Sequence, residues 1–265
     1  MLDAVFERAR AAGRIAFIPY VMAGDPDLAT TRAILVALGE AGADAIELGI
    51  PYGDPLADGP TVAAAGQRSL TAGTRLAAVL ELIGRTAAAL PPIVLFTYYN
   101  PIDRYGVERF ADAAADAGAA GAIVPDVALE ESAPLREALL ARGLAMPLLV
   151  APSTPRERAA RIAQATSGFI YVVSRLGVTG AGTAPDLSPL RRQLAMLREI
   201  TAKPLAVGFG IGGAADVAPI APLADGVVVG SALIDAYAGS SGDEAAQRVR
   251  DFVTPLITAA RKEPA

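Results

Sequence analysis

Residues 28–49 read LATTRAILVALGEAGADAIELG, and this stretch contains the unit that the rest of the chain repeats. Residues 28–41 form a helical pattern rich in Ala and Leu, and Gly42, which follows it, suits the C-cap of a helix. Residues 45–49 then form a short run that is apolar apart from Glu47. A nearly continuous apolar run is typical of a parallel strand covered by helices. The stretch therefore predicts a helix followed by a buried parallel strand.

The same alternation extends in both directions from this unit. Further apolar runs typical of strands lie at 15–21, 93–97, 121–124, 147–150, 169–173, 204–208 and 226–229. Further helical patterns lie at 76–90, 107–117, 130–141, 155–165 and 190–201. This alternation predicts an α/β fold, a (β/α)8 TIM barrel formed by a single domain of residues 1–265. Helical segments at 2–11 and 243–262 are expected as additional N- and C-terminal helices, and an open doubly wound sheet is the alternative that the periodicity leaves open.

The composition narrows the chemistry that the chain can perform. The 265 residues contain neither His nor Cys, which removes the commonest general base, thiolate nucleophiles and most catalytic zinc sites. The net charge of −5 disfavours binding to nucleic acid or to an anionic membrane surface. Charged residues and prolines interrupt every apolar run before the ~18 residues that a membrane span needs, and Asp3 and Glu7 do not fit a signal peptide. We therefore expect a cytoplasmic protein that uses carboxylates, hydroxyls or backbone groups and requires no metal.

Two carboxylates stand out near the end of the second predicted strand, where a barrel of this kind carries its chemistry. Glu47 lies within an apolar strand, and burial raises the pKa of a carboxyl group toward the neutral value that an acid/base catalyst needs. A structural carboxylate paired with Arg would give the same pattern. Asp58 lies in a loop, residues 50–60, whose length and richness in Pro, Gly and Asp are typical of a functional loop, although Asp beside Gly is also ordinary in turns.

Glycine clusters follow the last three predicted strands. They read GVTGAGT at 177–183, GFGIGG at 208–213 and GS at 230–231. Glycines allow backbone N–H groups to approach an anion closely, and phosphate sites in such barrels commonly lie after strands seven and eight. The clusters predict a phosphate site, with tight turns as the alternative. With Glu47 and Asp58, they indicate acid/base or lyase chemistry on a phosphorylated substrate.

Several motifs resemble those of the tryptophan synthase α-subunit family. They are ELGIP at 47–51, DPLADGP at 54–60, YYNP at 98–101, SR at 174–175, GVTG at 177–180, GFGI at 208–211 and GS at 230–231. The resemblance runs in the same order over nearly the whole chain, and its first two motifs are highly specific. It implies a TIM barrel that cleaves indole-3-glycerol phosphate to indole and glyceraldehyde 3-phosphate, in the last stage of L-tryptophan biosynthesis.

The resemblance also implies roles for individual residues. Glu47 matches the catalytic acid/base, Asp58 matches the carboxylate that holds the indole N–H, and Tyr171 matches a tyrosine beside the catalytic Glu. The implied indole pocket consists of Tyr20, Phe96, Ile123, Leu149 and Phe209, and the implied phosphate-binding residues are Thr179, Gly180, Gly210, Gly230 and Ser231. Residues 51–60 and 177–187 would be mobile lids whose closure excludes water and positions Asp58.

The implied partner is a tryptophan synthase β subunit, in an α2β2 heterotetramer. The β subunit would carry pyridoxal phosphate and receive the indole, whereas this chain would need no cofactor of its own. Three alternatives remain. A free-standing indole-3-glycerol phosphate lyase would use the same carboxylates. A phosphosugar isomerase would need a second acid/base residue, for which Asp126 is the contender, and the presence of both Glu47 and Asp58 argues against a non-catalytic activator.

Overall fold

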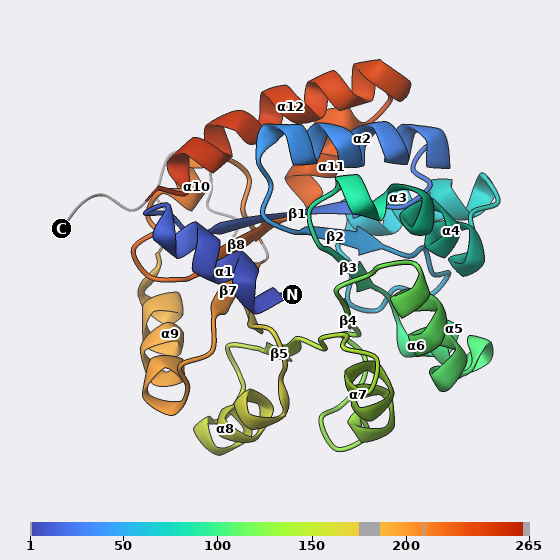
Figure 1. Ribbon diagram of the computed structural model, residues 1–265. Helices are drawn as coiled ribbons and strands as arrows, with labels where there is room; N and C mark the ends of the chain where they lie inside the picture. Colours follow the sequence, from blue (N-terminus) through green and yellow to red (C-terminus); the bar gives the residue numbers. More distant parts are fainter. Residues whose placement is uncertain (1, 175–185, 209, 262–265) are drawn as a thin grey trace.

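The computed structural model describes residues 2–174, 186–208 and 210–261 (Figure 1). Its strands are β1 (Ala16–Met22), β2 (Ile46–Gly49), β3 (Ile93–Phe96), β4 (Gly121–Ile123), β5 (Leu148–Val150), β6 (Ile170–Val173), β7 (Leu205–Gly208) and β8 (Gly226–Val229). Its helices are α1 (Leu2–Ala11), α2 (Leu28–Ala41), α3 (Pro60–Thr71), α4 (Leu76–Thr86), η1 (Ala87–Ala89), α5 (Tyr99–Tyr105), α6 (Val107–Asp116), α7 (Ala133–Leu140), α8 (Arg156–Ala165), α9 (Ser188–Ile200), α10 (Ala214–Val217), α11 (Ser231–Tyr237) and α12 (Gly242–Ala259). Every predicted strand is present, with bounds that differ by at most one residue at either end.

The strands form a nearly closed parallel barrel with helices around it (Figure 1). Their order is β4-β3-β2-β1-β8-β7-β6-β5, and all pairs are parallel. The two ends of this order meet at a parallel bridge between Gly121 and Ala145, where the Ala122 N–H donates to the Ala145 carbonyl at 2.9 Å. The predicted barrel is therefore confirmed, and the open doubly wound sheet is wrong.

Helix α2 shows how the local sequence sets the boundaries of an element. The Asp27 carboxylate accepts a hydrogen bond from the Thr30 N–H at 2.7 Å and so caps the first turn. Gly42 adopts φ 95° at the other end, a left-handed conformation that glycine adopts without strain. These signals place α2 at the residues that the sequence predicts.

Helices α3, α5 and α10 lie in segments where the periodicity predicts no helix. The buried side of α3 carries only Ala65, Gly66 and Ser69, so this helix lacks the stripe of large apolar residues that makes a helix visible in a sequence. Helices α5 and α10 are short, at 7 and 4 residues. The predicted helix at 76–90 divides into α4 and η1.

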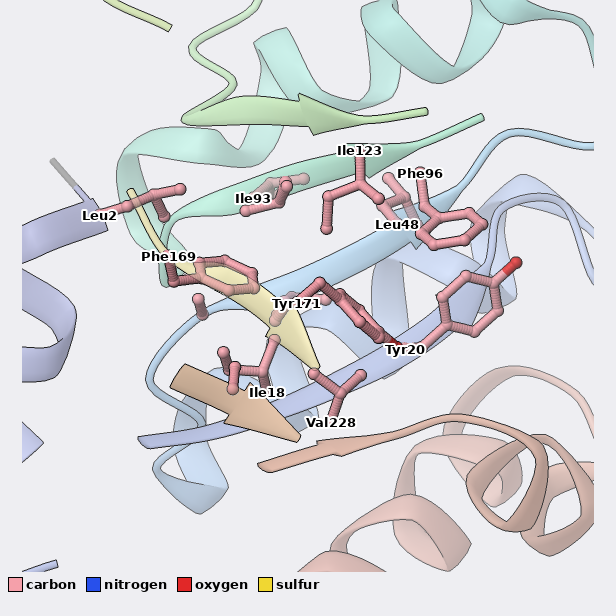
Figure 2. Close-up of a cluster of buried hydrophobic side chains, with 14 of the residues drawn as sticks. Leu2, Ile18, Tyr20, Leu48, Ile93, Phe96, Ile123, Phe169, Tyr171 and Val228 are labelled. Carbon is pink, nitrogen blue, oxygen red and sulfur yellow. The ribbon is translucent and has the colours of Figure 1, made fainter. Parts of the chain in front are cut away.

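The two terminal helices take different positions on the barrel. Helix α1 covers one end, where the rings of Phe6 and Phe169 lie 5.4 Å apart and Leu2 packs at the end of the barrel interior (Figure 2). Helix α12 runs alongside α2, and Arg250 forms an ion pair with Glu40 at 3.1 Å (Figure 1). Within the described residues, no helix is both long enough and apolar enough to span a membrane.

Candidate active site

A cavity of about 370 Å³ opens at the C-terminal ends of the strands. Eight of the residues that the sequence assigns to the site line it: Tyr20, Glu47, Asp58, Phe96, Tyr171, Gly210, Gly230 and Ser231. They come from β1, β2, β3 and β6 and from the segments that follow β2, β7 and β8. The fold therefore gathers residues that are up to about 200 positions apart in the sequence into one hollow, as expected for this face of a barrel.

Glu47 lies in β2 at the inner wall of this cavity and is completely buried. Neither carboxylate oxygen has a hydrogen-bond partner among the described residues. Burial without a partner penalises the charged form and raises the pKa of Glu47 to about 8. A carboxyl group with this pKa can both donate and accept a proton near neutral pH, which is the property that general acid/base catalysis requires.

Two buried tyrosines flank Glu47, and glycines make room for both. Tyr20 lies opposite Glu47 in the register between β1 and β2, and its hydroxyl lies where a Cβ on Gly49 would come within 2.2 Å. The hydroxyl of Tyr171 lies in the same way against Gly208, where an added Cβ would come within 2.3 Å. Burial raises the pKa of each phenol well above its usual value, with further contributions from Asp58 and Glu47 at Tyr20 and from Glu47 at Tyr171, so both hydroxyls remain protonated.

Asp58 occupies a different environment, in the loop between β2 and α3. It is half-buried at the cavity mouth, and its Oδ1 accepts a hydrogen bond of 2.9 Å from the hydroxyl of Tyr98. The same hydroxyl accepts the N–H of Ala57 at 2.9 Å, and the ring of Tyr52 packs against that of Tyr98 at 5.3 Å. Burial raises the pKa of Asp58, whereas the hydrogen bond from Tyr98 lowers it.

The opposite side of the cavity is formed by backbone-rich segments after β7 and β8. Its lining includes Gly210, Gly212, Gly230 and Ser231, and Gly210 has φ 80°, a conformation that favours glycine. Among the described residues, every charged side chain in the lining is acidic: Glu47, Asp58 and Asp235. An anionic group in this part of the cavity would therefore depend on N–H and hydroxyl donors.

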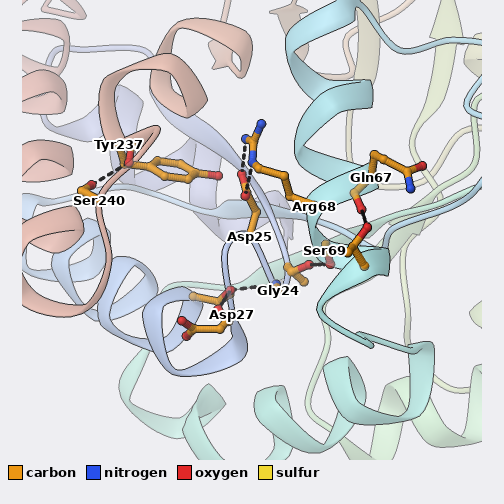
Figure 3. Close-up of polar contacts among 11 residues, drawn as sticks. Gly24, Asp25, Asp27, Gln67, Arg68, Ser69, Tyr237 and Ser240 are labelled. Atoms are coloured by element: carbon orange, nitrogen blue, oxygen red, sulfur yellow. Dashed lines mark hydrogen bonds and ion pairs between the residues drawn. The ribbon is translucent and has the colours of Figure 1, made fainter.

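Helix α3 follows the loop that carries Asp58, and helix α11 follows β8. The two helices meet at a polar cluster beside the end of β1 (Figure 3). The guanidinium of Arg68 in α3 donates to both carboxylate oxygens of the buried Asp25, at 2.7 and 2.8 Å. Ser69 in α3 donates to the Ala23 carbonyl at 2.5 Å, and the ring of Tyr237 in α11 lies beside the Asp25–Arg68 pair. This cluster fixes α3, and with it the end of the loop that carries Asp58.

The other predicted site residues do not line this cavity or lie outside the described residues. Ile123 is buried beside Phe96, behind the cavity wall (Figure 2). Leu149 lines a second cavity of about 240 Å³, together with residues such as Val127 and Leu129. Thr179, Gly180 and Phe209 lie outside the described residues. The predicted lid at 177–187 lies almost entirely outside them as well.

Sequence reasoning did not assign several residues in the surroundings of this cavity, and three of them show why. Tyr98 lies in a motif that the sequence singles out, but nothing in its spacing from Asp58 indicates the hydrogen bond between them. Asp235 follows Ser231 by one helical turn, a signal that could have placed it on the same face of α11. Val62 lies in the first turn of α3, a helix that the sequence does not predict. Within the described residues, no group of three or more acidic side chains could hold a metal ion.

Comparisons with known proteins identify the family of this chain. The family described as "Tryptophan synthase alpha chain" matches residues 6–261. The tryptophan synthase alpha chain of Prochlorococcus marinus (strain MIT 9313) is 47% identical over 257 residues, 96% of this chain and 93% of the relative. That of Arabidopsis thaliana is 43% identical over 261 residues, 98% of this chain and 94% of the relative.

Solved structures show the same agreement. A tryptophan synthase structure from M. tuberculosis, in its aminoacrylate- and BRD0059-bound form, superposes with a TM-score of 0.89 at 35% identity and covers 99% of this chain and 98% of that one. Tryptophan synthase subunit alpha from Legionella pneumophila str. Paris gives a TM-score of 0.88 at 32% identity, covering 98% of this chain and 97% of that one. The resemblance seen in the sequence motifs is thus confirmed, and the chain belongs to the tryptophan synthase alpha chain family.

Proposed function

We propose that this chain is a lyase that cleaves indole-3-glycerol phosphate to indole and glyceraldehyde 3-phosphate, in the last stage of L-tryptophan biosynthesis in the cytoplasm. One observation carries the proposal. One cavity contains a fully buried carboxyl group that has no hydrogen-bond partner among the described residues, Glu47, and a second carboxylate, Asp58, held by a hydrogen bond at its mouth. Acid/base chemistry needs a group of the first kind, and stabilisation of a developing cation needs a group of the second kind.

Glu47 would act in two steps, first donating one proton and then accepting another, which returns it to its starting form. In its protonated form it delivers the proton to the ring carbon that bears the glycerol chain, and the ring becomes cationic. The resulting carboxylate then takes the proton of the hydroxyl on the adjacent chain carbon. The carbon–carbon bond breaks, its electron pair returns to the ring, and the chain carbon becomes the aldehyde. A pKa of about 8 supports this role, because both forms of Glu47 are accessible near neutral pH.

Asp58 and the cavity walls would orient the substrate for these steps. The Asp58 carboxylate accepts the indole N–H and offsets the positive charge that develops on the ring. The side chains of Tyr20 and Phe96 contact each other edge to face, with ring centroids 5.5 Å apart, and offer an apolar surface for the indole. Tyr171 borders the same space beside Glu47. Ile123 supports Phe96 from behind, whereas the assignment of Leu149 and Phe209 to the indole pocket rests on the family resemblance alone.

The phosphate would bind at the side of the cavity formed after β7 and β8. Gly210, Gly230 and Ser231 lie there, and the backbone N–H groups and the Ser231 hydroxyl of this lining can serve as donors. Thr179 and Gly180 would complete the site by analogy with the family. No cofactor or metal ion of this chain takes part in the proposed reaction.

A tryptophan synthase β subunit is the expected partner of a chain in this family. We infer an α2β2 heterotetramer in which the β subunit carries pyridoxal phosphate and receives the indole. We place a contact with the β subunit at the loop that carries Asp58, where the apolar side chain of Leu56 is 82% exposed. The free-standing lyase remains the second candidate, because it would use the same residues without that contact.

An indole-release assay tests the proposal. Purified chain is incubated with indole-3-glycerol phosphate, with and without a β subunit from the same source, and both products are quantified. We expect indole and glyceraldehyde 3-phosphate in equal amounts, at a rate that the β subunit increases at least tenfold. Rapid turnover that the β subunit leaves unchanged would favour the free-standing lyase, and the absence of indole in both mixtures would contradict the proposal.

A further inference from the structure

The segment that carries Asp58 contacts Tyr98 at three points. This segment, residues 51–59, is called the Asp58 loop here. The ring of Tyr52 packs on the Tyr98 ring at an interplanar angle of 33°, and the N–H of Ala57 and the carboxylate of Asp58 both bond the Tyr98 hydroxyl. Tyr98 itself is only 3% exposed. A loop rich in Gly and Pro loses much conformational freedom when it is fixed, so these contacts have a strong influence on where Asp58 lies.

The chemistry of the groups settles the direction of the two hydrogen bonds. The N–H of Ala57 can only donate, so the Tyr98 oxygen accepts there. An ionised Asp58 carboxylate can only accept, so the single proton of the phenol points to Asp58. Burial and the nearby Asp58 raise the pKa of Tyr98 further above its usual value, so the phenol keeps this proton at any pH at which the protein works.

Tyr98 is held in place from the next strand of the barrel. The N–H of Tyr99 donates to both carboxylate oxygens of Asp126, at 3.0 and 3.1 Å. Asp126 follows β4, whereas Tyr98 follows β3, so the backbone beside Tyr98 is tied to a part of the barrel that does not belong to the Asp58 loop. The hydroxyl is therefore a fixed point to which the loop attaches.

We propose that Tyr98 is a positioning residue that holds the Asp58 loop against the cavity before substrate arrives, through its paired hydrogen bonds to Ala57 and Asp58. The inference rests on the proposed function, because it assigns to Tyr98 the task of presenting Asp58 to the indole N–H. Only one of the two oxygens of Asp58 is bonded by Tyr98, which leaves the other able to accept from the substrate.

Removal of the Tyr98 hydroxyl also has a predictable effect on the titration of Asp58. The titratable groups around it are Tyr20 from β1, Glu47 from β2 and Asp235 from α11, in addition to Tyr98 itself. Asp126 acts on Tyr98 from the end of β4. None of these neighbours is cationic, so Tyr98 is the group in this set that favours the ionised form of Asp58. Its loss raises the pKa of Asp58, and activity that needs the carboxylate then begins at a higher pH.

The variant Tyr98→Phe removes one oxygen and keeps the ring, and Tyr99→Phe is the matched control at the next residue. We expect Tyr98→Phe to lower kcat/KM about tenfold, in keeping with a hydrogen bond to a charged group, and to move the acid limb of its pH profile upward. When Asp58 is already replaced by Asn, Tyr98→Phe should lower kcat/KM by less than threefold. Backbone amide exchange measured by NMR should show at least tenfold faster exchange at Ala57.

These measurements distinguish a failure of the inference about Tyr98 from a failure of the proposed function. Tyr99→Phe should match the unmodified chain in every measurement, and equal thermal unfolding of the two variants shows that Tyr98→Phe folds. Unchanged exchange at Ala57 and an unmoved acid limb in Tyr98→Phe would overturn the inference. A failure of the proposed function appears instead in the unmodified chain, which would then release no indole while Ala57 still depended on Tyr98.

Discussion

The two carboxylates of the cavity lie in opposite surroundings. Glu47 belongs to a strand, has no exposed surface and has no hydrogen-bond partner among the described residues. Asp58 belongs to a loop, is half-buried and accepts a hydrogen bond from Tyr98. The difference shows how two carboxyl groups in one site can have separate tasks, proton transfer for Glu47 and stabilisation of a positive charge for Asp58. Burial raises the pKa of both groups, but only Asp58 has a hydrogen bond that favours its ionised form and opposes this rise.

The difference also extends to the elements that carry the two groups. Glu47 is fixed by the strand ladders of β2, which pairs with β1 on one side and with β3 on the other. The position of Asp58 depends on side chains from elsewhere, namely Tyr98 after β3 and, through α3, the Arg68–Asp25 pair. Changes near Glu47 should therefore alter the chemistry itself, and changes near Asp58 should alter how often the site is correctly assembled.

The largest effect is expected when the isolated carboxyl group is replaced. Glu47→Gln keeps the shape of the side chain but cannot exchange a proton, so kcat should fall by about 10²–10⁴-fold or more. Substrate affinity, measured by calorimetry, should change only a few-fold. The control is Glu81→Gln, which alters a largely exposed carboxylate on α4. A Glu47→Gln enzyme with normal turnover would remove the basis of the proposed mechanism.

Replacement of the second carboxylate should be nearly as severe. Asp58→Asn retains a hydrogen-bond acceptor but removes the charge, so it no longer offsets the cation that develops on the indole ring. We expect kcat to fall by about 10²-fold, the scale seen when one electrostatic contact to a transition state is lost. Asp54→Asn is the control, measured in the absence of a β subunit, because it removes an exposed carboxylate from the same loop. Equal rates in the two variants would show that the charge of Asp58 has no role.

Gly49 faces the hydroxyl of Tyr20, so a larger residue at this position tests whether the site depends on where Tyr20 lies. In Gly49→Ala the new Cβ would lie 2.2 Å from the Tyr20 hydroxyl, so the ring must move toward the cavity. We expect the free energy of unfolding to fall by about 1–3 kcal/mol and substrate affinity, measured in the Glu47→Gln background, to weaken about tenfold. Gly53→Ala is the control, since an added Cβ there meets no atom within 4 Å. Identical behaviour of the two variants would mean that the position of Tyr20 is unimportant.

The last effect concerns folding rather than activity, and it is the pH dependence of stability. The pKa of Glu47 is raised from 4.5 to about 8 in the folded state, so the folded protein binds this proton more tightly than the unfolded chain does. The stability from this group is fully present below pH 4.5 and declines as the pH rises toward 8, by about 1.4 kcal/mol per pH unit. Glu47→Gln should lack this decline in denaturant unfolding at pH 5, 6, 7 and 8. Parallel stability curves for the two proteins would show that Glu47 has an ordinary pKa.

The sequence predicts the barrel and Glu47 for the same physical reason. Buried parallel strands appear as continuous apolar runs, and a single carboxylate inside such a run is conspicuous. Long-range relations leave no such signal. The hydrogen bond from Tyr98 to Asp58 joins two loops, and the exposure of Leu149 to a second cavity depends on how the short strand β5 is oriented. Helix α3 was missed because its buried face consists of small residues.

The order of the strands has a consequence for synthesis of the chain. β1 pairs with β8 over four positions, from Ala16 with Gly226 to Pro19 with Val229, whereas β4 meets only the segment before β5, at the bridge between Gly121 and Ala145. On the ribosome, β1 is the first strand to be made, and β8, which pairs with one of its edges, is the last. One edge of β1 therefore remains unpaired through most of translation, and a strand with an open edge is prone to aggregate. The interval before β8 emerges is the stage at which the nascent protein most needs protection by chaperones.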